Sequence, residues 1–353
     1  MMDKDALAFL EKLVTTPSPS GYEQPGQKLM RERMGLFSDT VRTDVHGNVI
    51  AAVNAAAPLR MMLAGHVDEI GLMVNHITKE GYIYVTQIGG VDPVVAVAQR
   101  VTIHGPKGPV PGVIGRKAIH LTDPDDRGKP MKLHELWLDI GAKNQKDAQK
   151  VVSTGDPITF DVGLTHLRNQ LVTARAFDDR MGAFVVAETL RKVQGKKLNV
   201  AVFGVSTVQE EIGLRGARTS AFGIDPQAGI AIDVGHATDT PGVEKTRAGD
   251  FACNKGPIVC RGANINPVLY GMIVDAAKKA KIAIQIEGTP GGTGTDANAI
   301  QISRAGVAAG LVSVPCRYMH SPCEVISLKD LDQASDLLAA LLARMPAEMD
   351  FTP

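Results

Sequence analysis

Residues 199–213 read Asn-Val-Ala-Val-Phe-Gly-Val-Ser-Thr-Val-Gln-Glu-Glu-Ile-Gly, an apolar run that ends in two adjacent acids. The part Asn199–Thr207 is short and rich in valine, which is typical of a strand buried inside a sheet. Glu210 and Glu211 follow it, and two acids at the end of a buried strand are costly unless something neutralises them. A metal ion would neutralise one acid and leave the other free to act as a general base toward water. A solvated acidic turn is the alternative interpretation of this segment.

Other apolar runs in the chain also end close to a histidine or an acid. The residues concerned are His66 and Asp68 after Arg60–Ala64, Asp178 before a predicted helix, Asp233 in the strand predicted over Ala228–Val234, and His320 after Val307–Pro315. Each of them alone could be a cap, an exposed acid or a structural histidine. Because ligands gather at the carboxyl ends of strands in such sheets, the whole set predicts a two-metal hydrolytic site.

Two local patterns refine this prediction. Residues i and i+2 of an extended chain face the same side, so Asp68 can accept the second ring N–H of His66 and fix its tautomer. Asp178 is the candidate bridge, because the two oxygens of one carboxylate can bind two cations roughly 3.5–4 Å apart. We expect its neighbours Asp179 and Arg180 to support its geometry.

Composition excludes several classes of partner. The chain has 353 residues, with 38 Lys plus Arg and 38 Asp plus Glu, so no basic surface for nucleic acid is indicated. No stretch approaches the ~18 apolar residues of a membrane span, and the N-terminal residues lack an apolar signal core. The cytoplasm is therefore the expected location. The four cysteines lack the CxxC spacing of structural zinc sites, and we expect them to be free thiols.

The pattern of elements predicts an α/β fold of two domains. Residues 1–69 and 165–353 alternate apolar runs with helical periodicity, which indicates one mixed sheet with helices on both faces. Residues 70–164 instead contain short β-like runs separated by Gly and Pro, and they predict a small inserted β-rich domain resembling a barrel. Its expected strands are Tyr82–Gln87, Val94–Ile103, Val110–Ile114 and Pro157–Phe160.

A glycine-rich loop, Gly291-Gly-Thr-Gly-Thr-Asp296-Ala297, completes the set of motifs. It lacks the lysine of a phosphate-binding P-loop, so we expect it to form a wall of the active cleft. The remaining histidines have no acidic partners in the sequence and are expected to be structural or on the surface. They are His46, His76, His104, His120, His134, His166 and His236.

Taken together, these motifs resemble the tetrahedral (TET) aminopeptidases, co-catalytic metallopeptidases that include glutamyl and deblocking aminopeptidases, some of them labelled endoglucanases. The resemblance covers essentially the whole chain. It is carried by HVDEIG at 66–71, AFDDRMG at 176–182, VQEEIGLRGA at 208–217, IDVGHATDTPG at 232–242, GGTGTDA at 291–297 and MHSPCEVIS at 319–327.

The resemblance implies a role for each site residue. His66, Asp178 and Asp233 would hold one divalent ion, and Asp178, Glu211 and His320 would hold the other. Glu210 would be the general base, Asp68 would orient His66, and the Asp178–Asp179 peptide bond would be cis. Zinc or cobalt is the expected metal, with manganese also suited to these ligands.

The same resemblance implies a zinc-exopeptidase-like fold, short peptides as substrates, and self-association. The domain at 70–164 would form dimers, and dimers would assemble into a tetrahedral dodecamer. Other functions considered are a carboxypeptidase or amidase on this scaffold, a glycoside hydrolase, and a non-catalytic peptide-binding assembly. Glycosidases normally use two free carboxylates and no metal pair, so the acids here fit metal ligation better.

Overall fold

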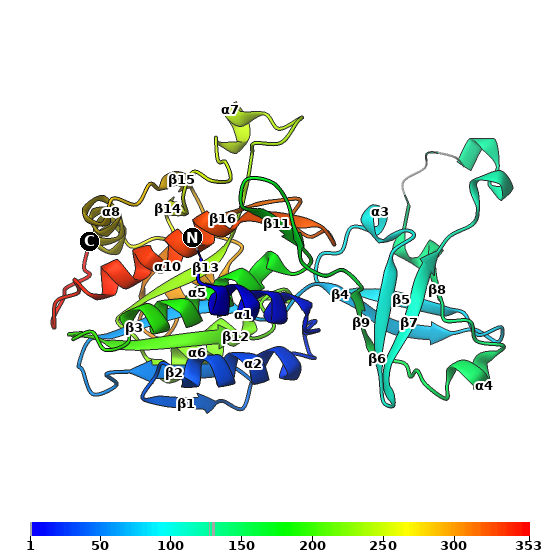
Figure 1. Ribbon diagram of the computed structural model, residues 1–353, viewed down its shortest axis with the longest axis horizontal. Coiled ribbons are helices and arrows are strands. Elements are labelled where there is room, and N and C mark those ends of the chain that lie inside the picture. Colours follow the sequence, from blue (N-terminus) through cyan, green and yellow to red (C-terminus); the bar gives the residue numbers. More distant parts are fainter. Residues whose placement is uncertain (1, 127, 129–130) are drawn as a thin grey trace.

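The computed structural model describes residues 2–126, 128 and 131–353. A large α/β body and a smaller β barrel lie side by side along the longest axis of the molecule (Figure 1). The α/β body contains a mixed sheet of 11 strands, in the order β1-β2-β12-β3-β13-β16-β17-β11-β10, with β14 joined to β16 and β15 joined to β14. The predicted fold class, a mixed sheet with helices on both faces and a barrel-like insertion, is confirmed.

The large sheet takes its strands from both ends of the chain. They are β1 (Thr40–Thr43), β2 (Val49–Val53), β3 (Arg60–His66), β10 (Thr165–His166), β11 (Leu171–Ala174), β12 (Ala201–Thr207), β13 (Ala228–His236), β14 (Ile258–Gly262), β15 (Gln285–Thr289), β16 (Ala308–Arg317) and β17 (Glu324–Ser327). Strands β12, β3, β13 and β16 are parallel neighbours, whereas β2 and β17 pair antiparallel to this centre.

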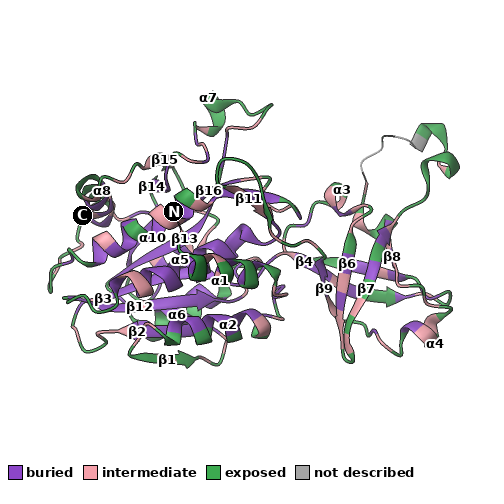
Figure 2. Cartoon of the chain, viewed as in Figure 1, coloured by how far each residue is buried: buried purple, intermediate pink, exposed green. Residues whose placement is uncertain are grey.

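Alternation along the central strands separates two apolar cores. Met61 and Leu63 of β3 belong to one core, and Met62 and Ala64 belong to the other. Because successive side chains of a strand point to opposite faces, this strand is buried on both sides. The central strands are accordingly buried along almost their whole length (Figure 2).

Helices cover both faces of the sheet. One core contains residues of α1 (Lys4–Thr15), α2 (Gln24–Gly35), α5 (Phe177–Val193), α8 (Pro267–Ala280) and α10 (Leu328–Leu342). The other contains residues of α6 (Arg215–Ile224) and α9 (Asp296–Gln301), and the short α7 (Lys245–Ala248) lies outside both. The N-caps explain two helix starts, because Asn266 accepts from Leu269 N and Ser327 accepts from Asp330 N.

The smaller body is a closed barrel with its own apolar core. Its strands are β4 (Gly71–Ile77), β5 (Ile83–Ile88), β6 (Arg100–Gly105), β7 (Gly108–Gly115), β8 (Trp137–Asp139) and β9 (Pro157–Phe160), and it also contains the short helices α3 (Pro93–Ala96) and α4 (Gln145–Ala148). The strand expected over Val94–Ile103 is wrong in its first half, because Pro93 and the Asp92 N-cap start a helical turn there.

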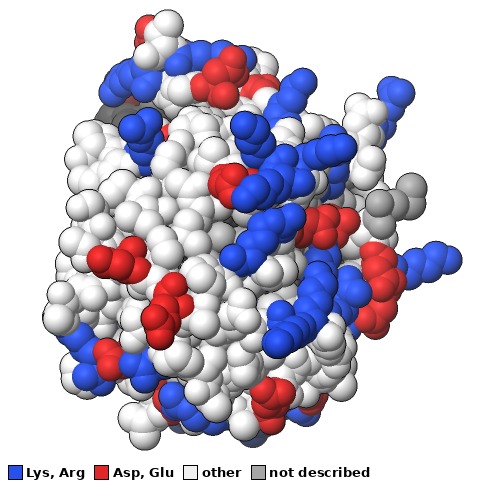
Figure 3. Space-filling model, turned by 90° about the vertical axis from the view of Figure 1, so that its left-hand side faces the viewer, with Lys and Arg blue, Asp and Glu red and all other residues white. Residues whose placement is uncertain are grey.

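Charges of both signs share the surface. On the side of the α/β body that lies at the left of Figure 1, basic side chains form an oblique band with acids among them, and a large area carries no charge (Figure 3). This mixture differs from the single-sign basic surface that nucleic-acid-binding proteins use. No helix within the described residues is long and apolar enough to cross a membrane.

Gly65 sets the approach of α5 to the sheet. A Cβ atom at this position would lie 2.4 Å from Gly182 C and 2.5 Å from Ala183 N, which are backbone atoms of α5. The absence of a side chain therefore allows the start of α5 to cross β3 directly, next to His66.

We predict that Gly65→Ala lowers the free energy of unfolding by about 1–3 kcal/mol, because the added methyl group has to displace helix backbone. Gly271→Ala is the matched control, because Gly271 lies exposed inside α8 and its Cβ would meet nothing within 4 Å. That change should raise stability by up to about 1 kcal/mol. Denaturant unfolding monitored by circular dichroism measures both, and equal effects of the two changes would contradict the close-approach argument.

Candidate metal centre

The carboxyl ends of the central strands bring the predicted ligands together. His66 is the last residue of β3 and pairs with Thr207, the last residue of β12. In the parallel pair β13–β3, Ala231 pairs with Ala64, and two residues further along each strand Asp233 lies level with His66. Glu210 and Glu211 follow β12 by three and four residues, so the same edge of the sheet carries them.

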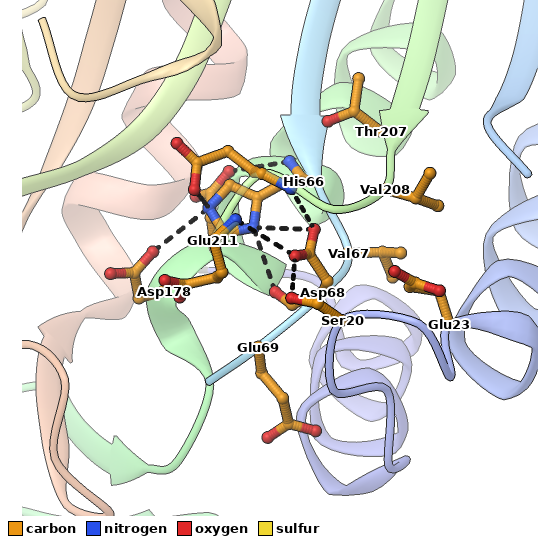
Figure 4. Close-up of polar contacts among 12 residues, drawn as sticks. Ser20, Glu23, His66, Val67, Asp68, Glu69, Asp178, Thr207, Val208 and Glu211 are labelled. Atoms are coloured by element: carbon orange, nitrogen blue, oxygen red, sulfur yellow. Dashed lines mark hydrogen bonds and ion pairs between the residues drawn. The ribbon is translucent and has the colours of Figure 1, made fainter. Parts of the chain in front are cut away.

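Two groups of possible ligands share one residue. The first is His66, Asp178 and Asp233, and the second is Asp178, Glu211 and His320, with the ligand atoms of each group within 4.8 Å of one another. These are the same two sets that the resemblance implied. Figure 4 shows Asp178, Glu211 and His66 directed toward one another from three different segments of the α/β body.

Asp178 has the geometry of a bridge between the two groups. Its Oδ1 lies 3.3 Å from His66 Nε2, and its Oδ2 lies 3.3 Å from His320 Nε2. The two oxygens of one carboxylate therefore face two different imidazoles. Glu211 Oε2 is 3.6 Å from His320 Nε2, on the side of the second group.

Backbone carbonyls orient both histidines. His66 Nδ1 lies 3.0 Å from the carbonyl oxygen of Asp68, and His320 Nδ1 lies 3.0 Å from that of Gly90. A carbonyl only accepts, so each Nδ1 carries a proton in this contact, and Nε2 is the ring nitrogen of each histidine that faces the acids. Gly90 leaves room for this contact, since a Cβ there would lie 2.9 Å from His320 Nδ1.

Asp68 does more than orient His66. Its carboxylate Oδ1 is 3.5 Å from His66 Nδ1, so its backbone carbonyl is the nearer partner, which differs from the contact that the sequence predicted. The carboxylate accepts hydrogen bonds from the backbone N–H of Glu210 at 3.0 Å and of Glu211 at 3.2 Å, and from the Ser20 hydroxyl at 2.7 Å (Figure 4). Asp68 thus ties the acidic turn after β12 to the end of β3.

Glu324 is a buried acid that the sequence analysis missed. Its Oε2 accepts from Asp178 N and its Oε1 accepts from His320 N, both at 3.0 Å. One carboxylate therefore holds the backbone of two residues that belong to the second ligand group. No sequence pattern singled it out, because it is an isolated acid at the start of the short strand β17.

The neighbours of Asp178 also differ from expectation in part. Asp179 supports the site, because its carboxylate accepts from His66 N at 3.1 Å and from Gly182 N at 3.0 Å. Arg180 instead points away from Asp178 and donates to the Leu13 carbonyl at 2.9 Å and to Glu69 at 2.5 Å. Arg180 therefore anchors α1 to Glu69, a buried acid next to Asp68 that sequence reasoning also missed.

The backbone around the site takes uncommon conformations. The Asp178–Asp179 peptide bond is cis, as the resemblance implied. Three non-glycine residues have left-handed φ values next to or within the ligand set, namely Ala176 at 59°, Gln209 at 56° and His320 at 61°. Such conformations cluster at functional sites, where the surrounding structure holds them.

Burial and mutual repulsion dominate the electrostatics of these acids. Burial raises the pKa of Glu210 to about 9, against the opposing effect of His66, and burial likewise raises the pKa of Asp233 to about 8. For Asp178, burial acts in the same direction, but hydrogen bonds to His320 and His66 outweigh it and hold the pKa below its usual range. The cluster concentrates more negative charge than two imidazoles offset, which is the electrostatic character of a cation site.

The ligand set fits a pair of divalent ions. Glu211 Oε1 is buried and has no hydrogen-bond partner among the described residues, and a buried carboxylate oxygen left in this way favours a cation. Imidazole nitrogen and carboxylate oxygen are the ligands that zinc, cobalt and manganese accept.

A cavity of about 620 Å³ opens onto the ligands. The glycine-rich loop forms one wall through Gly292, Thr293, Gly294 and Thr295, in agreement with its predicted place. His236 also lines the cavity, although the sequence placed it among structural or surface histidines. Its position at the end of β13, three residues after Asp233, was the signal that could have found it.

The chain is similar to known proteins over most of its length. The sequence model of the M42 glutamyl aminopeptidases matches residues 47–337, which is most of the chain. This chain belongs to the M42 family. As an M42 peptidase it is a metallo-aminopeptidase, and the resemblance to the TET aminopeptidases is confirmed.

Individual relatives of this M42 peptidase cover almost its whole length. It is 38% identical to a lysyl aminopeptidase of Pyrococcus furiosus, over 98% of this chain and 99% of that protein. A TET aminopeptidase from a marine sediment Thaumarchaeota archaeon has a TM-score of 0.93 at 34% identity, covering 98% of each chain. The TET1 peptidase of Pyrococcus horikoshii, which can assemble into a tetrahedron or a large octahedral shell, has a TM-score of 0.85 at 31% identity, over 96% of this chain and 100% of that chain.

For this M42 peptidase we predict that Glu324→Gln weakens metal binding by about 10–100-fold, because the amide cannot accept from both Asp178 N and His320 N. Titration of the metal-free protein with zinc against a competing chelator measures the affinity. Glu348→Gln removes an exposed acid and is the matched control. Unchanged affinity in Glu324→Gln would show that Glu324 does not position the ligands.

Proposed function

We propose that this peptidase removes N-terminal residues from peptides with two divalent ions bound by the five predicted ligands. His66, Asp178 and Asp233 would hold one ion, and Asp178, Glu211 and His320 the other. The observation that carries this proposal is Asp178, whose two oxygens face the imidazoles of both groups at 3.3 Å. When bound, such ions polarise a scissile carbonyl and lower the pKa of a water molecule next to it.

Glu210 is the proposed general base. It belongs to neither ligand group, yet its Oε2 lies 3.6 Å from His66 Nε2 and it lines the same cavity. A carboxylate in this place can take the proton of the attacking water and pass it to the leaving amine. Asp68 holds the backbone N–H of Glu210, which directs this side chain toward the ligands.

The proposed substrates are short peptides with a free N-terminus, whose amino group would bind next to the acids. Those acids favour a cationic amine over a carboxylate. A carboxypeptidase on the same scaffold is disfavoured, because the described residues that line the cavity include no Lys or Arg to bind a terminal carboxylate. An amidase acting on other amine-bearing substrates is the closer alternative.

Two further alternatives receive less support. A glycoside hydrolase normally works with two free carboxylates and no metal pair, whereas here Asp178, Glu211 and Asp233 belong to ligand groups. A non-catalytic peptide-binding assembly would not need Glu210 beside His66.

Self-association into dimers and a tetrahedral dodecamer is part of the proposal. It is supported by the whole-length likeness to the TET1 peptidase that can assemble into a tetrahedron or a large octahedral shell. The barrel, which lies beside the α/β body (Figure 1), is the proposed dimerisation domain. Light scattering of the purified protein would test it, and a monomer at micromolar concentration would contradict it.

The proposed location is a reducing compartment such as the cytoplasm, which suits the four free cysteines.

The two-metal aminopeptidase proposal predicts that chelated protein is inactive and that zinc, cobalt or manganese restores cleavage. The measurement is hydrolysis of aminoacyl p-nitroanilides and short peptides, with products resolved by mass spectrometry. Release of one residue at a time from free N-termini, at a metal stoichiometry of two per chain, is the expected result. Cleavage that resists chelation, or that starts at the C-terminus, would refute the proposal.

Glu210→Gln should lower kcat by about 10²–10⁴-fold while both metal ions stay bound, because glutamine keeps the shape but cannot accept a proton. Turnover of a leucyl p-nitroanilide and metal content by mass spectrometry test the two halves separately. Glu348→Gln again serves as the control for losing one carboxylate. If Glu210→Gln retained near-normal turnover, another group would have to be the base.

A further inference from the structure

Glu287 is an acid of the metal cavity that belongs to neither ligand group. It lies on β15 and lines the cavity together with Thr289, which shares its face of the strand because side chains alternate. Its side chain is partly buried, and its carboxylate has no hydrogen bond or ion pair with any described residue. Its oxygens are not among the buried unpaired atoms, so they are open to a ligand that enters the cavity.

The surroundings of Glu287 favour a positively charged ligand. None of the described residues lining the cavity is Lys or Arg. Arg261 on the neighbouring strand β14 packs over the Tyr270 ring, with its Cζ 5.6 Å from the ring centroid. Burial raises the pKa of Glu287, and His236 opposes that rise only in part. An ammonium or guanidinium group placed beside Glu287 would stabilise its ionised form.

Glu287 lies at a distance from the metal ligands that suits a long side chain. The strand order β13–β16–β14–β15 links Asp233 to Ser313, Ser313 to Ile258, and Ile258 to Gln285, two residues before Glu287. Three spacings of about 4.8 Å place β15 roughly 14 Å from β13. Small N-terminal side chains would end short of Glu287, whereas lysine and arginine carry their charge at the end of several bonds of about 1.5 Å.

Apolar groups also line this cavity. Leu214, Val234 and Met319 belong to the wall of the same cavity. Lysine and arginine place their methylene stems along apolar surfaces and keep their charged ends on polar partners. A cavity with ligands for a scissile peptide, apolar walls and one further acid thus matches a basic N-terminal residue.

We propose that Glu287 is the specificity-determining residue of this cavity, and that it selects peptides whose N-terminal residue is lysine or arginine. The inference rests on the proposed aminopeptidase function and adds the class of substrate to it.

The first test compares two substrates of similar shape on the wild-type, metal-reconstituted protein. Lysyl and norleucyl p-nitroanilide differ mainly in the terminal ammonium group, so their ratio of kcat/KM isolates the charge. We expect lysine to be preferred by about tenfold or more, which corresponds to about 1.4 kcal/mol. Equal kcat/KM values for the two substrates would overturn the specificity proposal without any variant.

The second test assigns the preference to Glu287. Glu287→Gln should lower the lysyl-to-norleucyl ratio about tenfold, and Glu287→Lys should favour a glutamyl substrate over a lysyl one. Asp250→Asn is the matched control. Asp250 and Glu287 both line an adjacent pocket, but only Glu287 also lines the metal cavity. This control removes the same charge nearby and should leave the ratio unchanged.

The outcomes separate the two proposals. If norleucyl substrate is cleaved and Glu287→Gln leaves the lysyl preference intact, the role of Glu287 is refuted while the aminopeptidase function stands. If Asp250→Asn lowers the ratio as much as Glu287→Gln, a general charge effect replaces the specific contact. Wild-type protein that cleaves no aminoacyl substrate with any metal would refute the function itself, and the inference with it.

Discussion

The mutual repulsion of buried acids is the constraint on which the rest of this structure depends. Asp178, Glu210, Glu211 and Asp233 all lie at one edge of a sheet whose strands are otherwise apolar. Each carboxylate loses hydration there, and each raises the energy of its neighbours. The fold holds them together by supplying backbone N–H donors to Asp68, Asp179 and Glu324, and by fixing two imidazoles between them.

This constraint explains why the supporting residues are themselves acids. Asp68 and Glu324 accept hydrogen bonds from backbone N–H groups of the segments that carry the candidate ligands, so their role is to place those side chains. A carboxylate with two oxygens can hold two separate segments, which an alcohol or a single carbonyl does less rigidly. These hydrogen bonds therefore fix the segments that follow the strands, so that side chains on them are held about as firmly as side chains within the strands.

Much of the fold and the residues of the candidate ligand set could be predicted from the sequence, because both depend on local patterns. The apolar run before Glu210 and the cap pairs at Asn266 and Ser327 fix strands and helices by short-range physics. Glu324 and Glu287 could not be predicted, since single acids acquire their roles only when distant strands meet. The sequence predicted a strand instead of the helical turn at Pro93, because the valines that follow favour a strand although Asp92 is a good N-cap.

The contact between His320 and Gly90 joins the two bodies of the molecule. Gly90 lies in the segment between β5 and α3 of the barrel, and its carbonyl fixes the ring of a proposed ligand in the α/β body. Displacement of the barrel relative to the sheet would therefore reorient that imidazole. If His320 binds an ion as proposed, thermodynamic reciprocity requires that fixing the barrel in place would favour ion binding, and that ion binding would favour the same placement of the barrel. The position of the barrel and the occupancy of the proposed metal site would in this way be energetically coupled within one chain.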